Sequence, residues 1–157
     1  MKFLKVNIMI FVLLLGALAY AELKSKDLLV SDAKARAVHI TVDALKQKID
    51  AGEKFFLIDV RTEKEYMNGH IKGAVWISRG TLEFDIQDVT ADPTADIVVY
   101  CRSGARGSLS MLALKDLGYE NVKDLDGGFK NWVSSGNSVY NMHGEIKVIN
   151  YGKKEND

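Results

Sequence analysis

The sequence of 157 residues lacks the features that mark several common protein classes. It has one cysteine, Cys101, so no internal disulfide can form. Its three histidines are scattered and do not combine with that cysteine at the spacing of a zinc site, so we expect no metal and no other cofactor. The formal net charge is zero, with 21 basic and 21 acidic residues, which argues against a nucleic-acid partner. Repeats and low-complexity tracts are also missing from the sequence.

The chain also has no apolar run of about 20 residues, the length that spans a bilayer. Its longest apolar run, Ile8 to Leu18, follows a basic segment with Lys2 and Lys5 and precedes Ala19-Tyr20-Ala21, which has the pattern of a signal-peptide cleavage site. We predict a secretory signal peptide over residues 1–21. The mature protein is then expected in the periplasm or an equivalent extracytoplasmic space, with no stable membrane association after cleavage. An uncleaved membrane anchor is the alternative.

The stretch from Asp96 to Gly118 places the only cysteine at a turn between a strand and a helix. Ile97 to Tyr100 is a short apolar run that predicts a buried strand, and the segment after Gly107 predicts a helix ending at Gly118. In an open α/β sheet, ligands bind beyond the carboxyl ends of the strands, where such turns lie. Cys101 is therefore the candidate nucleophile.

Two arginines, Arg102 and Arg106, flank the Cys101 thiol. An unperturbed cysteine, with a pKa of about 8.5, is only about 3% thiolate at pH 7. A helix dipole stabilises an anion by about 0.3–1 kcal/mol, whereas an arginine about 5 Å away contributes about 3 kcal/mol at an effective dielectric constant of about 20. A lone cysteine is most often a small buried apolar residue, but a core does not place two arginines around such a residue. We therefore predict a reactive thiolate held by arginines and backbone N–H groups.

Several short motifs follow one another along the chain. They are Leu57-Ile58-Asp59-Val60-Arg61, Glu65-Tyr66, Gly69-His70-Ile71, Gly73-Ala74, Cys101-Arg102-Ser103-Gly104-Ala105-Arg106 and Asp126-Gly127-Gly128-Phe129-Lys130-Asn131-Trp132. In this order they resemble the rhodanese family over about residues 38–135. The resemblance implies a single α/β domain of the rhodanese-like fold, with a mainly parallel central sheet and helices on both faces, which the alternation of strands and helices also favours.

The same resemblance implies sulfur transfer as the function. Cys101 would take sulfur from a small anionic donor such as thiosulfate, hold it as a persulfide and pass it to an acceptor such as cyanide or a thiol, which an exported partner protein could carry. Asp59 and Arg61 would support the loops beside the site, and His70 would belong to the scaffold rather than act as a base. The expected substrate-binding residues are Arg102, Ser103, Gly104, Ala105 and Arg106.

Two other functions stay open. Cysteine phosphatases and arsenate reductases, which are related to rhodaneses, also use a cysteine loop, but their arginine follows five intervening residues. Here Arg106 follows four, and Gly107 stands where a phosphatase would need its arginine. The second alternative is a non-enzymatic persulfide carrier or sensor.

The rest of the chain divides into segments around the predicted domain at residues 38–135. Residues 22–37 are polar and suggest a linker or loosely packed extension, and residues 136–157 a C-terminal extension with a hairpin or edge strand near 139–140 and 146–149. Within the domain, we expect helices at 41–50, 62–69, within 79–89 and at 129–133, and strands at 55–60, 74–77 and 121–125.

Overall fold

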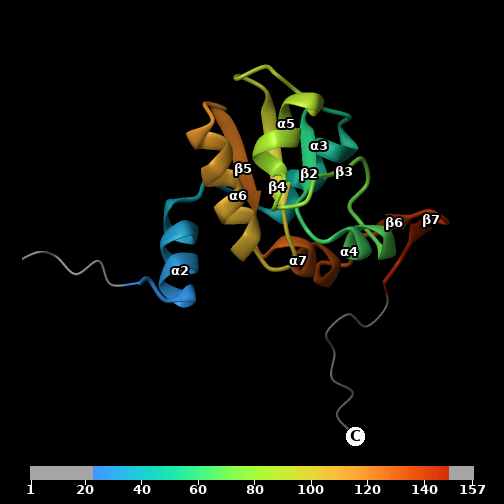
Figure 1. The fold of residues 1–157 in the computed structure, drawn as a ribbon. Coiled ribbons are helices and arrows are strands. Elements are labelled where there is room, and N and C mark those ends of the chain that lie inside the picture. The colour runs from blue at the N-terminus through green and yellow to red at the C-terminus, as the bar shows by residue number, and fades with distance from the viewer. Residues whose placement is uncertain (1–22, 149–157) are drawn as a thin grey trace, which may run out of the picture.

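The computed structural model describes residues 23–148, so the predicted signal peptide at residues 1–21 lies outside the described residues. Figure 1 shows helices packed around a central sheet. The helices are α2 (Lys26–Arg36), α3 (Val42–Asp50), α4 (Glu63–Asn68), α5 (Leu82–Val89), α6 (Ala105–Asp116) and α7 (Gly128–Ser134). The strands are β1 (His39–Ile40), β2 (Phe56–Asp59), β3 (Val75–Trp76), β4 (Asp96–Tyr100), β5 (Asn121–Leu125), β6 (Val139–Asn141) and β7 (Gly144–Ile146).

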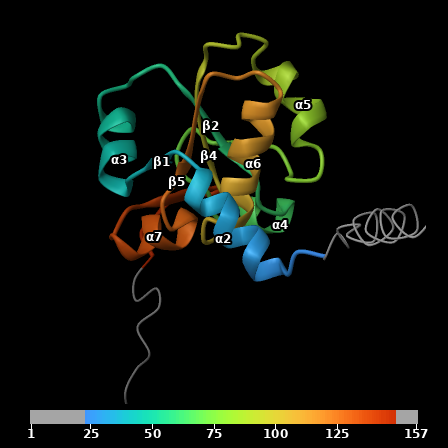
Figure 2. The same cartoon turned by 90° about the vertical axis from the view of Figure 1, so that its left-hand side faces the viewer.

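The central sheet is parallel throughout and has the strand order β1-β5-β4-β2-β3. Helices cover both of its faces: in Figure 2, α3 and α7 lie to the left of the sheet and α5 and α6 to the right. The predicted α/β class with a mainly parallel sheet is therefore confirmed. β4 is the middle strand, so the residue that follows it emerges at the centre of the carboxyl edge.

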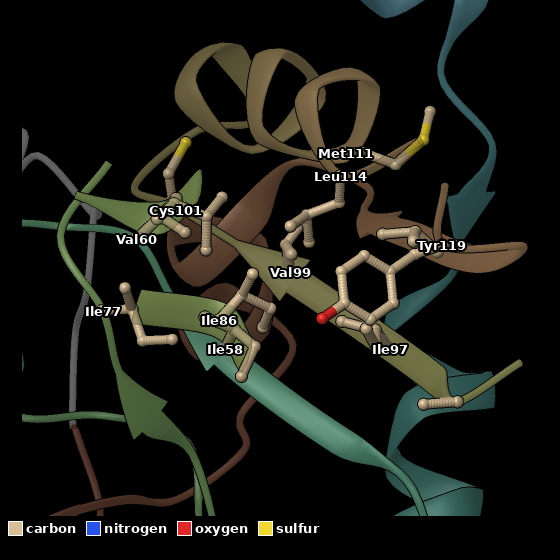
Figure 3. Close-up of a cluster of buried hydrophobic side chains, with 13 residues drawn as sticks. Ile58, Val60, Ile77, Ile86, Ile97, Val99, Cys101, Met111, Leu114 and Tyr119 are labelled. Atoms are coloured by element: carbon tan, nitrogen blue, oxygen red, sulfur yellow. The ribbon is translucent and has the colours of Figure 1, made fainter. Parts of the chain in front are cut away.

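Alternate residues of β4 build the two halves of the core. Ile97 and Val99, together with Cys101 just after the strand, pack with side chains of α5 and α6, whereas Val98 and Tyr100 pack with side chains of α3 and α7. A strand buried on both faces needs the continuous apolar run seen in the sequence. Figure 3 shows Cys101 beside Val60 on the face that α6 covers.

The predicted helix starts at Thr41 and Thr62 are confirmed, because both threonines cap their helices. The Thr41 hydroxyl accepts a hydrogen bond from the backbone N–H of Ala44 (3.2 Å). α4 begins with a capping box: Thr62 accepts from the backbone N–H of Glu65 (3.3 Å), and the Glu65 carboxylate accepts from the backbone N–H of Thr62 (3.0 Å). These caps fix the helices that flank β2.

Residues 26–36 differ from the expected linker, since they form α2, which packs against α6. Ala33 is the buried residue of this helix, at 1% exposure. With so narrow a contact the helix needs no apolar stripe, so its sequence lacks the periodicity that predicts a packed helix. The segment is an ordered extension of the fold, at least from Lys26 onward.

The C-terminal extension contains the predicted hairpin. β6 and β7 pair antiparallel, with Val139 opposite Ile146, and Tyr140 of β6 makes an isolated bridge to His70. This bridge joins the hairpin to the loop after α4. Among residues 23–148, no helix combines the length and apolar character needed to cross a membrane.

Candidate active site

The loop between β4 and α6 is shorter than the sequence suggested, because α6 begins at Ala105 rather than after Gly107. Gly104 precedes the helix with φ of +92°, in the left-handed region that favours glycine. Arg106 therefore lies in the first turn of α6. The backbone N–H groups of that turn have no partners within the helix, so they are available to an anion beside Cys101.

Helix α7 holds the other side of this loop through two backbone hydrogen bonds. The N–H of Phe129 donates to the carbonyl of Cys101 (2.8 Å), and the N–H of Lys130 donates to the carbonyl of Arg102 (2.9 Å). Gly128 allows this approach, since a Cβ atom there would lie 2.5 Å from the Cys101 carbonyl oxygen. The Asp126-Gly127-Gly128 turn thus directs two loop carbonyls toward α7 and away from the interior of the loop.

Cys101 is 1% exposed and belongs to the apolar cluster between the sheet and helices α5 and α6 (Figure 3). Burial among apolar side chains opposes an anion unless charges or hydrogen-bond donors compensate for the lost water. The compensation has to come from the loop and from the residues next to it. Arg106 and Arg102 are the candidates for stabilising a Cys101 anion, and their side chains lie in different surroundings.

Arg106 is paired with Glu65 of α4. Its Nη1 and Nη2 atoms lie 3.1 Å and 3.2 Å from the two carboxylate oxygens. Burial by itself raises the pKa of Glu65, but the hydrogen bonds from Arg106 and Thr62 outweigh it and lower this pKa to about 2. For Arg106, burial opposes the charge, while Glu65 and the Cys101 sulfur favour it, and the pKa is raised. Arg106 therefore stays charged between Glu65 and Cys101.

Arg102 is exposed and forms no ion pair with any of residues 23–148. It lies at the edge of a pocket of about 280 Å³ next to the loop. The pocket wall includes Phe129 and Val139, so the C-terminal extension contributes to it. Of the two flanking arginines, Arg102 is the one whose charge is available to a ligand from solvent.

Asp59 and Arg61, predicted as supporting residues, form a buried ion pair at the end of β2. Arg61 Nη2 donates to Asp59 Oδ2 (2.6 Å) and to the carbonyl of Gly69 (2.7 Å). The Arg61 guanidinium also lies 3.9 Å from the centre of the Phe129 ring. This pair connects β2, the loop after α4, and α7. Because Arg61 is only 4% exposed, its charge faces Asp59 rather than solvent.

His70 packs into the scaffold next to α4. Its ring stacks on Tyr66 at 4.0 Å between centroids, and Nδ1 lies 3.1 Å from the Tyr66 carbonyl oxygen. These contacts occupy one ring face and one ring nitrogen.

Comparison with known proteins identifies the family of this fold and loop. The sequence model of the family described as "Rhodanese-like domain" matches residues 41–135, more than half of the chain. The chain belongs to the rhodanese family. The match includes the whole Cys101 to Arg106 loop and its partner Glu65, but it leaves out α2, β1 and the β6–β7 hairpin.

Three relatives of this rhodanese carry names that concern sulfur. The chain is 37% identical over 93 residues to the "Putative sulfurtransferase YtwF" of Bacillus subtilis, covering 59% of this chain and 87% of YtwF. It is 32% identical over 94 residues to the "Thiosulfate sulfurtransferase GlpE" of Shewanella oneidensis, covering 60% and 90%. It is 31% identical over 93 residues to the "Putative sulfur carrier protein YrkF" of Bacillus subtilis, covering 59% of this chain but about half, 49%, of YrkF. The family supports sulfurtransferase chemistry.

One similar solved structure has a name of another kind. A protein of Rhodopseudomonas palustris described as "Protein of Unknown Function RPA3614, Possible Tyrosine Phosphatase" superposes with a TM-score of 0.65 at 25% identity, covering 77% of this chain and 98% of that one. The rhodanese fold is therefore shared with a protein for which phosphatase activity has been considered. The geometry of the cysteine loop, rather than the fold, has to distinguish sulfur transfer from phosphate hydrolysis.

Two acidic residues next to the rhodanese loop were not predicted from the sequence. The capping box accounts fully for Glu65, so no local pattern indicates a second partner, yet its carboxylate also binds Arg106, 41 positions away. Asp124 on β5 interrupts the apolar pattern of a buried strand, at 0% exposure. An aspartate at a buried strand position is rare, so this interruption of the pattern was the one sequence feature that indicated a special role for Asp124.

Proposed function

We propose that this rhodanese is a thiosulfate sulfurtransferase with Cys101 as its nucleophile. The Cys101 thiolate attacks the outer sulfur of thiosulfate, the sulfur–sulfur bond of the donor breaks, and sulfite leaves with the bonding electron pair. The sulfur stays on Cys101 as a persulfide anion. An acceptor such as cyanide or a thiolate then attacks the terminal sulfur, and the cysteine thiolate is restored. Covalent catalysis divides one transfer into two easier steps.

The observation that carries this proposal is the position of Cys101 close to the first turn of α6, with Arg106 beside it and Arg102 at the surface without an ion pair to the described residues. The free N–H groups of the loop and of that turn suit the persulfide anion. We assign Arg102 to the sulfonate end of the donor, because its charge is available. Arg106, anchored by Glu65, holds the loop and favours the sulfur anion. Ser103, Gly104 and Ala105 supply loop backbone.

The loading half-reaction tests the proposal without any assumption about the acceptor. The intact mass of the protein is measured after incubation with thiosulfate and removal of the excess donor. We expect a gain of one sulfur atom, lost again on addition of cyanide. Cys101→Ser is the matched control and gains nothing, since a serine oxygen forms no persulfide. A wild-type protein that takes up no sulfur from thiosulfate, or a Cys101→Ser variant that still does, contradicts the proposal.

A persulfide carrier is the second candidate, and the name of YrkF favours it. A carrier would load sulfur on Cys101 in the same way but release it only to a specific partner. Steady-state turnover separates the two: an enzyme converts many equivalents of thiosulfate and cyanide, whereas a carrier stops after one equivalent.

We also propose that the protein is exported, on the pattern of residues 1–21. N-terminal sequencing of the protein from fractionated cells should give Glu22 as the first residue of the extracytoplasmic form. An intact Met1 on soluble cytosolic protein would contradict export.

A further inference from the structure

Asp124 lies under the catalytic loop and is incompletely paired. Its side chain is 0% exposed, and Oδ2 accepts a hydrogen bond from the Ser108 hydroxyl at 2.7 Å. Oδ1 has no hydrogen-bond partner among residues 23–148. A buried carboxylate is normally surrounded by donors, because burial of an unpaired charge is costly.

The backbone of α6 is shaped to accept this carboxylate. A Cβ atom on Gly107 would lie 2.1 Å from Asp124 Oδ1, so no side chain fits there. A Cβ atom on Gly104 would lie 3.9 Å from Oδ2 and 3.7 Å from Lys34 Nζ of α2. The Asp124 carboxyl group therefore rests against the first turn of α6, on the flank of the same helix end that faces Cys101.

His39 of β1 turns its ring nitrogen Nδ1 toward Asp124. Its Nε2 atom lies 3.0 Å from the carbonyl oxygen of Lys34, which only accepts, so Nε2 carries a hydrogen. In neutral His39 the other nitrogen, Nδ1, then presents a lone pair to Asp124 Oδ2 at 3.7 Å.

Some groups around Asp124 favour its ionised form, and others favour its neutral form. Burial is the largest effect and raises the pKa of Asp124 to about 7. Ser108 of α6, His39 of β1 and Lys34 of α2 lower this pKa, whereas Asp126 raises it. Protonated and ionised Asp124 are thus both accessible around neutral pH.

We propose that Asp124 is a positioning residue that controls the charge of the Cys101 sulfur: in its neutral form it supports the loop, and in its ionised form it opposes the sulfur anion. Both groups use the positive end of α6, and like charges disfavour each other. The inference deepens the proposed function because it concerns the same sulfur, but it does not depend on sulfur transfer. α2 and β1, which lie outside the family match, take part through Lys34 and His39.

The titration of the only cysteine in the chain tests this inference directly. The ultraviolet absorbance of the thiolate is followed from about pH 6 to pH 9, with Cys101→Ser as the blank. Asp124→Asn should lower the pKa of Cys101 by about half a unit, which is about threefold more thiolate at a pH below that pKa. Asp126→Asn, which removes the same charge from an exposed position two residues away, should produce a much smaller change. A folded Asp124→Asn protein that titrates like the wild type overturns the proposal.

His39→Gln gives a second, independent test that does not alter Asp124 itself. Glutamine keeps an N–H donor for the Lys34 carbonyl but removes the group that favours ionised Asp124. Asp124 should then stay neutral to a higher pH, so His39→Gln should increase the thiolate fraction of Cys101 just above pH 7. The increase should vanish when Asp124→Asn is already present. If Asp124→Asn fails to fold, His39→Gln alone decides: more thiolate supports the proposal and an unchanged titration overturns it.

Discussion

Two carboxylates beside α6, Glu65 and Asp124, have opposite environments. Glu65 lies partly exposed on α4 and receives hydrogen bonds from Arg106 and Thr62, and its pKa falls to about 2. Asp124 is fully buried on β5 and has one side-chain hydrogen-bond donor within residues 23–148, Ser108, and its pKa rises to about 7. Burial raises the pKa of both carboxyl groups, but only Glu65 has an arginine that outweighs this effect, so the two groups differ in charge despite their common position beside α6. Glu65 on one side of the loop holds Arg106 in place, whereas Asp124 on the other side can hold a proton.

We expect the largest effect on stability and sulfur loading from Gly107→Ala, because it disturbs the packing of Asp124 against α6. The new Cβ atom would meet Asp124 Oδ1 at 2.1 Å, so the carboxylate or the helix must move. We expect a loss of about 1–3 kcal/mol in the free energy of unfolding and of most sulfur loading. Urea unfolding and intact mass measure the two losses.

Asp124→Ala supplies the control for this clash. If the two side chains compete for one space, the double variant Gly107→Ala/Asp124→Ala should be less destabilised than the sum of the single variants. Strict additivity of the two free energies would show that Gly107 is needed for another reason.

Arg102→Ala and Arg106→Ala should separate ligand binding from loop support. Loss of a charged contact to the donor costs about 1.5–3 kcal/mol, so Arg102→Ala should lower kcat/KM for thiosulfate about ten- to a hundredfold without changing Tm. Arg106→Ala should lower both kcat/KM and Tm, because it also removes the ion-pair partner of the half-buried Glu65. If Arg102→Ala equals the wild type at low salt, the donor is bound by Arg106 instead.

The two carboxylates should also give opposite pH dependences of stability. The lowered pKa of Glu65 stabilises the fold above its ordinary pKa of 4.5, and this stabilisation is lost as the pH falls toward 2. The raised pKa of Asp124 has the reverse sign: the unfolded chain ionises first, so the free energy of unfolding falls as the pH rises from about 4 to about 7.

Urea unfolding at a series of pH values measures both slopes. Glu65→Gln should reduce the acid slope, to which Asp96 also contributes, and cost about 1–2 kcal/mol of stability, because an ion pair and part of a cap are lost. Asp124→Asn should remove the slope between pH 4 and 7. A Glu65→Gln protein that keeps the full wild-type slope below pH 4.5 would place the responsible carboxylate elsewhere.

The sequence predicted much of the fold because its signals are local. The apolar run before Cys101, the Thr41 and Thr62 caps and the glycines after Asp126 each act within a few residues of themselves. The pairing of Arg106 with Glu65 and the contact of Asp124 with Gly107 join residues 41 and 17 positions apart, and no spacing rule connects them. Helix α2 was missed for a related reason, since a single buried alanine leaves no pattern. Cys101 was found because its neighbours along the chain are unusual.

Hydrolysis of para-nitrophenyl phosphate should be negligible, and this expected null result separates sulfur transfer from phosphatase chemistry. A phosphoryl group brings three equatorial oxygens and an apical leaving group into the loop, whereas a persulfide brings one terminal sulfur. The loop closes after four residues, with Arg106 already in the helix and turned toward Glu65. A phosphatase would need its arginine one position later, and at Gly107 Asp124 leaves no space even for a Cβ atom. The loop thus lacks the length for a phosphoryl group, and Glu65 holds the arginine that closes it. Inserting one residue between Ala105 and Arg106 should impair sulfur loading, because it would displace Arg106 from Glu65. Robust phosphatase activity that depends on Cys101 in the unmodified protein would refute this argument from loop size.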